Sequence, residues 1–535
     1  MKKKVLIGGA WPYANNSMHI GHLAALLPGD IIARYHRNIG NDVIYVSGTD
    51  SHGTPITIRA KNEGITPSEI AIKYHTEFTK NFNDLNFSYD LYTATTTPYH
   101  KEKVGELLKV IYENGYIYEK DEKQDFCETC NEFLSDREII GTCPYCKGEA
   151  RGDQCEECLR ALETNELLNK RCKTCDNASI LKDNKHLYFK LSALQDNIQK
   201  LLDSNRNKWR KNAVNETVKY LENGLIDRAI TRQLSWGVDV PFPHYEDKKV
   251  YVWIEAVMGY LTTLMSVTED RNLNYLDYLA NNKNVLNYYV HGKDNIPFHT
   301  VIFPALLQSI DKNYHLPDYI ISSEYVNMND EKMSKSKGNL ITVNELLSKF
   351  NPDSIRYYMI INNPERRDIN FSEDDFIQTH NKFLVGVLGN FINRNVSFIH
   401  KKFNGKVKEG TISPDIIKET KKLYKDIGNL IERGELRTSL EAIMNYVAMG
   451  NKYYDTMEPW NQVKDDMDEF NNTTCTCMYM IANIANFLDA FIPTKADEIR
   501  KIFNNQKDEW KEVELKGDIQ LTQAQLLFER IEIEK

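Results

Sequence analysis

Residues 3–47 have the sequence KKVLIGGAWPYANNSMHIGHLAALLPGDIIARYHRNIGNDVIYVS. Residues 3–10 form a mostly apolar run that contains two glycines near its end, which is typical of a buried strand. Apolar positions at helical spacing over 18–39 predict a helix that begins near His19, and 42–47 has the composition of a second strand. A strand, a helix and a strand at this spacing form a βαβ unit. The opening of the chain therefore predicts a parallel sheet in an α/β domain.

The same strand pattern returns late in the chain. Residues 284–291 and 318–323 are apolar and rich in β-forming residues, and a cysteine-rich region lies between the early and the late strands. We therefore expect one sheet whose sequence is interrupted by an insertion. From about residue 376 the strand signals fade, and long helical periodicity follows over residues 376–400, 415–433, 435–456 and 473–500. These segments predict an all-helical C-terminal domain.

The composition is that of a globular protein. The 535 residues are 41% hydrophobic and 27% charged, and 26 glycines with 16 prolines are too few for a collagen-like or a Pro/Gly-rich disordered chain. The net charge of −9 excludes a uniformly basic nucleic-acid coat, so any contact with a polyanion must come from a local patch. No apolar run approaches the ~18 residues of a membrane span, and the apolar stretch 5–10 is too short for a signal sequence. We expect a soluble, cytoplasmic protein with no membrane partner.

Cysteines are concentrated in the insertion, where eight of the ten form four Cys-x-x-Cys pairs: Cys127/Cys130, Cys143/Cys146, Cys155/Cys158 and Cys172/Cys175. Two such pairs can complete a four-thiolate shell around one zinc ion, which is a closed and therefore structural site. A redox or disulfide role is the alternative, and the absence of an export signal disfavours it. The spacing leaves the partnering open, because sequential pairs and nested pairs both satisfy two ions. Cys475 and Cys477 have a different spacing and are expected to be packed thiols.

One short motif lies at the start of the first predicted helix, His19-Ile20-Gly21-His22. A helix N-terminus offers unpaired N–H groups and partial positive charge to phosphates. Two imidazoles three residues apart share a helical face, and Gly21 lets an adenine or a ribose approach the backbone. Alone the motif is weak evidence, because two histidines near a helix start are more often ordinary polar residues.

A second motif, Lys332-Met333-Ser334-Lys335-Ser336-Lys337-Gly338, follows a predicted strand. A lysine–serine loop is usually a solvated turn. Its ammonium groups can nevertheless reach a triphosphate and neutralise the charge that develops on a pyrophosphate leaving group. The chain contains no GxxxxGK[ST] and no GxGxxG sequence, so the P-loop and dinucleotide-binding hypotheses lose their main support.

Together the two motifs resemble the class I aminoacyl-tRNA synthetases, whose paired signatures HIGH and KMSKS they match letter for letter. Further runs are similar to the methionyl-tRNA synthetase family: residues 10–15 (AWPYAN), 48–55 (GTDSHGTP), 251–253 (YVW) and 291–299 (HGKDNIPFH). The likeness covers nearly the whole chain. The cysteine insertion resembles that family's connective peptide in its form with all four zinc knuckles.

The resemblance implies a Rossmann-type parallel-sheet α/β catalytic domain with a zinc-knuckle insertion, followed by an all-α anticodon-binding helix bundle. The expected parts are the first catalytic half (1–115), the connective peptide (116–230, knuckles at 127–175), the second catalytic half (231–325), the KMSKS loop and linker (326–375) and the helical domain (376–535). The resemblance also implies two structural Zn²⁺ ions with nested ligands, Cys143/Cys146/Cys155/Cys158 in one site and Cys127/Cys130/Cys172/Cys175 in the other. Many relatives dimerise through a further C-terminal barrel, for which residues up to 535 leave no room, so we expect a monomer.

The implied activity is that of a methionine–tRNA ligase. The family activates L-methionine with ATP to methionyl-adenylate and pyrophosphate, and then transfers methionine to tRNA(Met), initiator and elongator, for translation. No covalent enzyme intermediate forms, so catalysis depends on positioning and on charge stabilisation. By resemblance the catalytic residues are His19, His22, Lys332 and Lys335, and the ATP-binding residues are Gly21, His19, His22, Asp294 and Lys335, with Mg²⁺ accompanying ATP.

By the same resemblance the methionine-binding residues are Trp11, Tyr13, Asp50, Trp253, Tyr260 and His299. Asp50 would pair with the substrate ammonium, and the aromatic walls suit a soft thioether. One departure is Trp11, because relatives often carry leucine there. The residues that match the family's CAU-anticodon readers are Asn390, Arg394 and Trp460. They lie in or near the required basic patch, since residues 376–410 carry six basic side chains against Glu409.

Two other functions compete with this hypothesis. A synthetase for valine or isoleucine would usually carry a large editing insertion, whereas the insertion at 116–230 is short and rich in cysteine. A catalytically dead, zinc-containing tRNA-binding protein would have no need for both signatures. Exchange of pyrophosphate into ATP that depends on methionine alone would distinguish all three.

Overall fold

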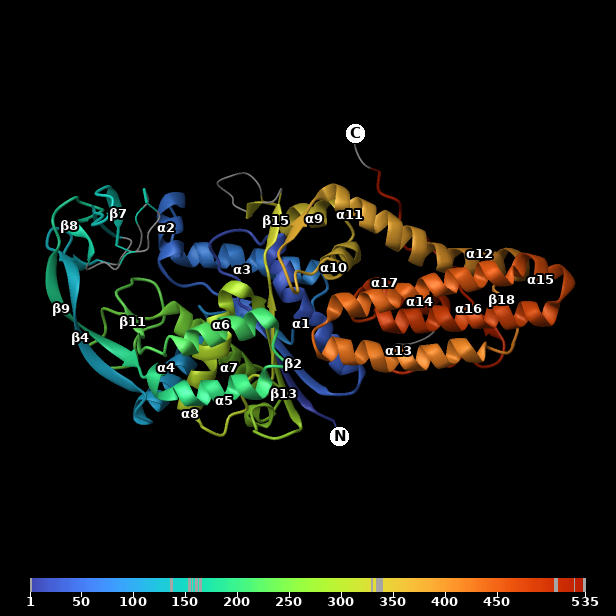
Figure 1. The fold of residues 1–535 in the computed structure, drawn as a ribbon, viewed down its shortest axis with the longest axis horizontal. Coiled ribbons are helices and arrows are strands. Elements are labelled where there is room, and N and C mark those ends of the chain that lie inside the picture. Colours follow the sequence, from blue (N-terminus) through green and yellow to red (C-terminus); the bar gives the residue numbers. More distant parts are fainter. Residues whose placement is uncertain are drawn as a thin grey trace.

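The computed structural model describes residues 2–134, 138–152, 155, 157–158, 162, 166–328, 331–332, 340–504, 509–523 and 525–532. The molecule is elongated, with an α/β body in the middle (Figure 1). A helix bundle extends from one side of the body, and an arm that carries the cysteines extends from the other.

The body is built on a five-stranded sheet of order β14-β13-β1-β2-β3, in which every neighbouring pair is parallel. Its strands are β1 (Lys4–Gly9), β2 (Asp42–Thr49), β3 (Leu91–Ala94), β13 (Val285–Gly292) and β14 (Tyr319–Ser323). The predicted parallel sheet is confirmed. The strand order reverses between β1 and β13, and ligands of open α/β sheets bind at such a switch point, beyond the carboxyl ends of the strands.

Helices cover both faces of this sheet. Because side chains alternate along a strand, Val5 and Ile7 belong to the apolar core that includes α1 (Ile20–Asn38) and α10 (Pro352–Ile361), whereas Leu6 belongs to the opposite core. That second core contains α4 (Pro98–Glu113), α7 (Val252–Asp270) and α8 (Phe303–Ile310). The result is a three-layer domain whose ligand-binding edge is left to the loops. Additional helices are α2 (Thr54–Glu63), α3 (Pro67–Asp84), α5 (Gln195–Asn205), α6 (Lys211–Glu222) and α9 (Val343–Lys349).

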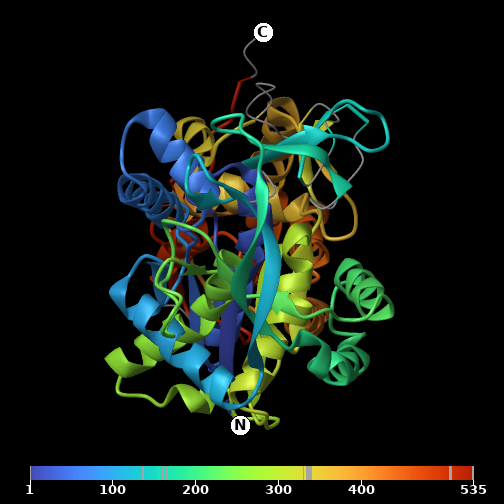
Figure 2. The same cartoon turned by 90° about the vertical axis from the view of Figure 1, so that its left-hand side faces the viewer.

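The arm is a long antiparallel ribbon of β4 (Ile117–Cys127) and β9 (Ile180–Phe189). Figure 2 faces this ribbon and shows it crossing in front of the body. Its outer end carries β5 (Glu132–Phe133) and a small sheet of order β7-β6-β8, formed by β7 (Glu149–Arg151), β6 (Ile139–Thr142) and β8 (Leu168–Cys172). The cysteine region is therefore held away from the sheet, between α4 and α7 in the sequence.

Short elements connect these parts. They are β10 (Arg228–Ala229), β11 (Thr231–Arg232), β12 (Lys249–Val250), β15 (Val326–Met328), β16 (Glu331–Lys332), β17 (Ile369–Phe371), β18 (Lys406–Val407), β19 (Ile519–Gln520), the 3-10 helices η3 (Leu191–Leu194), η4 (Tyr275–Tyr278) and η5 (Lys293–Asn295), and the π-helix η6 (Phe298–Ile302).

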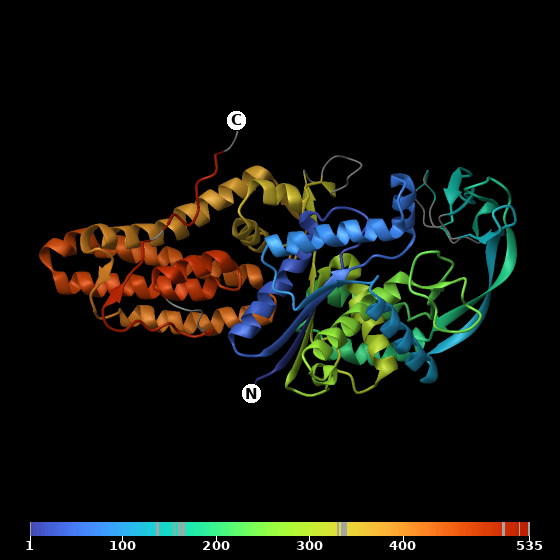
Figure 3. The ribbon, with the colours of Figure 1, turned by 180° about the vertical axis from the view of Figure 1, so that it is seen from behind.

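The C-terminal part is predominantly helical, as predicted, with one short two-stranded sheet of β18 and β19 (Figure 3). Its elements are α11 (Glu373–Thr379), the π-helix η8 (His380–Gly389), α12 (Asn390–Phe403), α13 (Pro414–Glu432), α14 (Leu436–Met457), α15 (Pro459–Asp465), α16 (Met467–Leu488) and α17 (Pro493–Ile502). One expected helix, 473–500, is wrong as a single element. Pro493 has no backbone N–H to continue a helix and instead begins a new one at its first position.

A buried arginine fastens the bundle to the body. Arg356 on α10 is fully buried, and its guanidinium donates to the Asp30 carboxylate on α1 at 2.6 Å and to the carbonyl of Phe491 in the bundle at 2.9 Å. Among the described residues, no helix has the length and the apolar character that a membrane crossing requires.

Candidate functional site

The sequence-predicted active-site residues follow the carboxyl ends of three neighbouring strands. His19 and His22 open α1 after β1, Asp50 follows β2, and Asp294 lies in η5 directly after β13. Because these strands are parallel and adjacent, their ends lie at one edge, and β1 and β13 flank the switch point. Asp294 is exposed there and accepts a hydrogen bond from the Tyr325 hydroxyl.

The two histidines of the first motif cap α1 reciprocally. His19 is the N-cap residue, and its Nδ1 accepts from the Gly21 N–H at 3.1 Å, while Nδ1 of His22 accepts from the His19 N–H at 3.2 Å. The motif therefore has a structural cause as well as a functional one, since it satisfies N–H groups that a helix start leaves unpaired.

This capping determines which nitrogens face a ligand. Burial lowers the pKa of His19 to about 4, and burial together with the neighbouring His19 lowers the pKa of His22 well below its usual value. Both rings are therefore neutral near pH 7. Because each Nδ1 is used as an acceptor, the proton of each neutral ring lies on Nε2. The helix start thus presents two Nε2–H donors, together with the partial positive charge of the helix.

The second motif flanks the same helix start. Strand β16, which contains Lys332, pairs with β15. After the motif, the Ile20 N–H donates to the Ile341 carbonyl at 3.4 Å, and the Val343 N–H donates to the Met18 carbonyl at 2.9 Å. Lys335 lies outside the described residues. The described segment that follows residues 333–339 therefore lies next to the first motif.

The residue predicted to hold the substrate ammonium, Asp50, is buried beside Tyr13, which is predicted to form part of the aromatic wall. Asp50 is 3% exposed, and its backbone pairs with that of Tyr13. Burial and the negative charge of Glu255 raise the pKa of Asp50 well above its usual value. The Tyr13 hydroxyl donates to the His52 carbonyl at 2.6 Å, which fixes the ring beside the Asp50 segment. A buried carboxylate with a raised pKa is stabilised in its ionised form by a cation.

The predicted aromatic wall comes from α7 and η6. The Trp253 ring is partly exposed and stacks on Phe298, with ring centroids 4.4 Å apart. Tyr260 is buried and donates its hydroxyl to Nε2 of His299 at 2.8 Å, while Nδ1 of His299 donates to the Asn295 carbonyl at 2.8 Å. Burial lowers the pKa of His299 to about 4, so this ring stays neutral and the Tyr260 hydroxyl keeps a fixed orientation.

Trp11 occupies a slot that two glycines create. A Cβ atom added at Gly48 would lie 2.5 Å from the Trp11 ring, and one added at Gly259 would lie 2.4 Å from it. The ring also packs against Tyr260 in an edge-on arrangement, with centroids 6.5 Å apart. The large side chain of Trp11 therefore fits because Gly48 on β2 and Gly259 on α7 carry no side chain.

A buried cluster that no sequence motif indicated lies beside Trp11, whose ring centroid is 6.0 Å from that of His100. The carboxylate of Glu255 on α7 accepts hydrogen bonds from Nδ1 of His52 at 2.8 Å and from Nε2 of His100 at 2.9 Å. One signal could have found it, because Glu255 is the single charged residue in the apolar run 254–265. Its partners could not have been found this way, since they come from distant parts of the chain.

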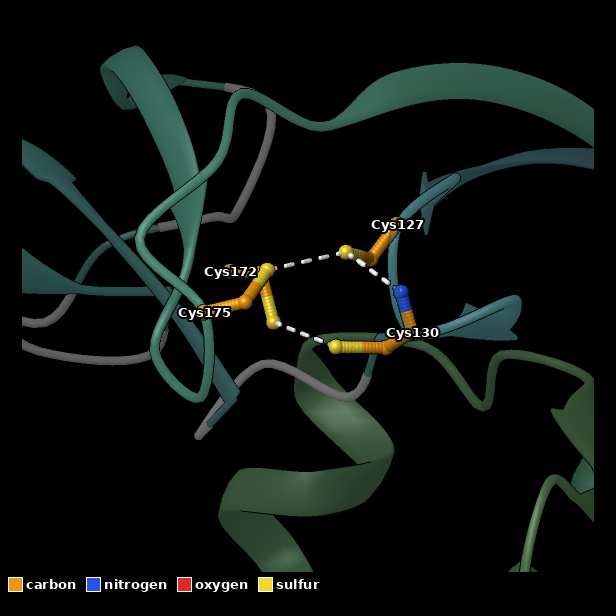
Figure 4. Close-up of side chains that lie close together, drawn as sticks. All are labelled: Cys127, Cys130, Cys172 and Cys175. Carbon is orange, nitrogen blue, oxygen red and sulfur yellow. Dashed lines mark hydrogen bonds between the residues drawn. The ribbon is translucent and has the colours of Figure 1, made fainter.

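The eight paired cysteines form two clusters of four, Cys127/Cys130/Cys172/Cys175 and Cys143/Cys146/Cys155/Cys158. Within each cluster all sulfurs lie within 4.8 Å of one another, and Figure 4 shows the first, in which Sγ of Cys127 lies 3.4 Å from Sγ of Cys175. This is the nested grouping that the resemblance implies. Four thiolates around zinc lie about 3.8 Å apart, given Zn–S bonds of about 2.3 Å, so the donor sets fit this ion. The ten cysteines form no disulfide, and Cys475 and Cys477 are buried in the bundle, as expected.

The predicted anticodon residues lie on α12 and α15, two helices of the bundle that extends away from the sheet (Figure 1). Asn390 donates to Asn451 on α14 at 3.2 Å, and Arg394, one turn further along α12, is paired with Asp455 on α14. The Arg394 guanidinium also lies over the ring of Tyr454, 4.3 Å from its centroid. Trp460 on α15 is partly exposed and packs against the same Tyr454, which brings the three predicted residues onto one surface.

Two family models match the chain. One, described as tRNA synthetases class I (M), covers residues 5–396, and the other, described as the anticodon binding domain of methionyl tRNA ligase, covers residues 406–533. The chain belongs to the methionyl-tRNA synthetase family. The resemblance inferred from the sequence motifs is therefore confirmed.

Individual relatives agree with this assignment. Methionine–tRNA ligase 1 of Alkaliphilus oremlandii is 46% identical over 528 residues, which cover 99% of this chain and 97% of the relative. A methionine–tRNA ligase of Bacillus cereus is 44% identical over 533 residues, with the same two coverages. The fold is shared with Mycobacterium tuberculosis methionyl-tRNA synthetase in complex with methionyl-adenylate, at a TM-score of 0.81 and 24% identity, over 99% of this chain and 100% of that one.

Proposed function

We propose that the chain is a methionine–tRNA ligase, which activates L-methionine with ATP and transfers it to tRNA(Met), initiator and elongator. The observation that carries this proposal is the pairing of the first signature with the segment that follows the second: the backbone of residues 18–20 is bonded to that of 341–343, in a chain of this family. We also propose that the chain acts as a cytoplasmic monomer.

In the first step, a methionine carboxylate oxygen attacks the α-phosphate of ATP. The new P–O bond forms as the bond to pyrophosphate breaks, so the chain must position the two substrates and stabilise the pyrophosphate charge. The Nε2–H groups of His19 and His22 are the proposed donors to phosphate oxygens, with Gly21 allowing close approach, and the Asp294 carboxylate is the proposed partner of the ribose. Lys335, assisted by Lys332, is the proposed cation for the leaving pyrophosphate. Mg²⁺ would enter with ATP, held mainly by the phosphates, and neutralise part of their charge.

Methionine would bind with its ammonium on Asp50 and its thioether against aromatic rings. Burial and the Glu255 charge raise the pKa of Asp50. An ammonium beside the carboxylate would stabilise its ionised form. Trp11, Tyr13, Trp253, Tyr260 and His299 are the proposed side-chain wall. A soft, polarisable thioether suits such an aromatic surface.

In the second step, a hydroxyl of the terminal ribose of the tRNA attacks the adenylate carbonyl, and AMP leaves. Asn390, Arg394 and Trp460 are the proposed readers of the CAU anticodon, because an amide, a guanidinium and an exposed ring can bond and stack on unpaired bases. In each of the two cysteine clusters the four thiolates would hold one Zn²⁺, which supplies a structural crosslink of the arm.

Amino-acid-dependent exchange of pyrophosphate into ATP tests this function. The purified protein should exchange with methionine and not with valine or isoleucine at the same concentration. Exchange that prefers one of the branched amino acids would support a different synthetase. A folded protein that shows no exchange with any of them, yet binds tRNA, would support the tRNA-binding alternative.

A further inference from the structure

A carboxylate is buried without solvent contact at the centre of the body. Glu255 on α7 is 0% exposed, and its two oxygens accept from His52, in the loop after β2, and from His100, on α4. The other ring nitrogen of His100 is bonded to the Thr262 hydroxyl at 2.9 Å. Leaving one member of such a group unpaired is costly, so the three side chains form a single unit.

This unit joins the segments that carry the proposed methionine pocket. His52 lies two residues after Asp50, and its carbonyl accepts from the Tyr13 hydroxyl. Glu255 lies on the same helix as Trp253 and Tyr260, between the two. The bonds to His52 therefore tie the ammonium side of the pocket to the helix that provides its aromatic side.

Charge adds a second connection. Asp50 and Glu255 are both buried, and the only hydrogen bond to the Asp50 carboxylate among the described residues is a long one, 3.5 Å, from the His52 N–H. Glu255 has two imidazole partners, whereas Asp50 has no cationic partner in the described structure. Two nearby buried carboxylates with one of them unpaired favour a bound cation.

We propose that Glu255, clamped by His52 and His100, is a positioning residue for the substrate ammonium: it holds the Asp50 segment against α7 and adds a second negative charge behind Asp50. This inference rests on the proposed function, because it takes the ammonium to be that of methionine. Glu255 does not touch the substrate in this account and acts through Asp50.

The titratable groups around Asp50 and Glu255 determine the direction of the pH effect. The groups that face these two carboxylates are His52 from the loop after β2, His100 from α4 and Tyr13 from the loop after β1. Burial is the larger cause of the raised pKa of Asp50, and the Glu255 charge raises that pKa further. Methionine binding should therefore release a proton wherever the free protein has Asp50 protonated, and its affinity should fall as the pH falls. Removing the charge with Glu255→Gln should move the midpoint of that fall to lower pH.

The test measures methionine binding by calorimetry and the KM values of both substrates in pyrophosphate exchange. For Glu255→Gln we expect the methionine KM and Kd at pH 8 to rise about tenfold, because one of two attractive charges is lost, while the KM for ATP stays within about twofold. Glu255→Asp keeps the charge but is too short to reach both histidines, so it should keep the wild-type pH midpoint with an intermediate KM. Glu269→Gln, the same change on an exposed residue at the far end of α7, should match the wild type.

Several outcomes would overturn the inference. Equal rises in both KM values, or a weaker methionine affinity with no change in the pH midpoint, would show that Glu255 only supports the fold. If thermal unfolding shows that Glu255→Gln does not fold, His100→Gln removes one clamp and must reproduce the selective rise in the methionine KM. A wild-type protein without methionine-dependent exchange would contradict the proposed function itself, whereas a wild type with exchange and an unchanged Glu255→Gln would contradict only this inference.

Discussion

His19 and Thr342 pair through their backbones in an antiparallel bridge. His19 caps the helix of the first nucleotide signature, and Thr342 caps α9, which follows the second signature. The segment that follows the second signature is therefore bonded to the start of α1, although the two signatures lie in opposite halves of the sequence that forms the sheet.

The first prediction concerns that loop. Lys335→Ala should lower the rate of methionyl-adenylate formation by about a hundred- to a thousandfold, because its charge is needed mainly as pyrophosphate departs. Methionine binding and thermal stability should stay at wild-type values. Lys349→Ala, which removes an exposed lysine at the end of α9 that is paired with Glu373 on α11, is the matched control and should exchange normally. Exchange by Lys335→Ala at the parent rate would remove the lysine from the mechanism.

Metal content tests the cysteine clusters. Freshly purified, reduced protein should contain two Zn²⁺ per chain by mass spectrometry or a chelator assay. Cys127 and Cys172 belong to one cluster in the structure, so the double variant Cys127→Ser/Cys172→Ser should lose one ion and keep the other. Sequential partnering would place these residues in different sites, and the double variant would then lose both ions. Cys475→Ser, in the bundle, should retain two.

The slot around Trp11 predicts a rescue. Gly259→Ala should lower the free energy of unfolding by roughly 1–3 kcal/mol and raise the methionine KM, because the three atoms nearest to its Cβ all belong to Trp11. Adding Trp11→Leu should recover most of the lost stability in a denaturation-based double-mutant cycle. Gly48→Ala should not be recovered this way, since its Cβ would also meet the Thr93 carbonyl at 2.8 Å. Additive effects at positions 11 and 259 would contradict the packing.

Stability should depend on pH through buried histidines. Burial and nearby Lys3 lower the pKa of His36 to about 3 in the folded chain, against about 6.5 when unfolded. Between these values only the unfolded state binds the proton, so the unfolding free energy falls as the pH falls from about 6.5 to about 3. His36→Gln lacks this contribution. It should be less stable than the wild type at pH 7, because His36 bonds Tyr288 and Asn41, and the gap should narrow by roughly 1–2 kcal/mol at pH 5. Parallel stability curves in urea would show that His36 is not the group responsible.

Local patterns in the sequence were sufficient to predict much of the fold. The βαβ unit, the late strands and the helical C-terminus each follow from periodicity within one segment. Strand β3 was missed because Leu91–Ala94 is short and carries no apolar alternation. The break between α16 and α17 was missed because apolar residues continue through Ala490–Ile492, although Pro493 marked it.

Some residues of the candidate site could likewise be predicted from local motifs, and others could not. His19, His22 and the paired cysteines are visible as spaced motifs, and the nested grouping came only from family resemblance. Glu255 with His52 and His100 depends on contacts between three distant segments, which no local pattern contains. The fit of Trp11 likewise depends on glycines on two other elements. Tertiary contacts of this kind determine how a pocket is built, and they appear only in the folded structure.

Charging of tRNA with methionine tests the central claim most directly. The wild-type protein, with ATP, Mg²⁺ and labelled methionine, should aminoacylate a tRNA(Met) transcript with a CAU anticodon and fail with the same transcript carrying GAU. Arg394→Ala and Trp460→Ala should lose most of this charging yet keep tRNA-free pyrophosphate exchange, because the surface on α12 and α15 lies far from the sheet. The control is Arg437→Ala, which removes an exposed arginine at the start of α14 and should charge normally. Equal charging of both transcripts, or no methionine on the CAU transcript at all, would contradict the account.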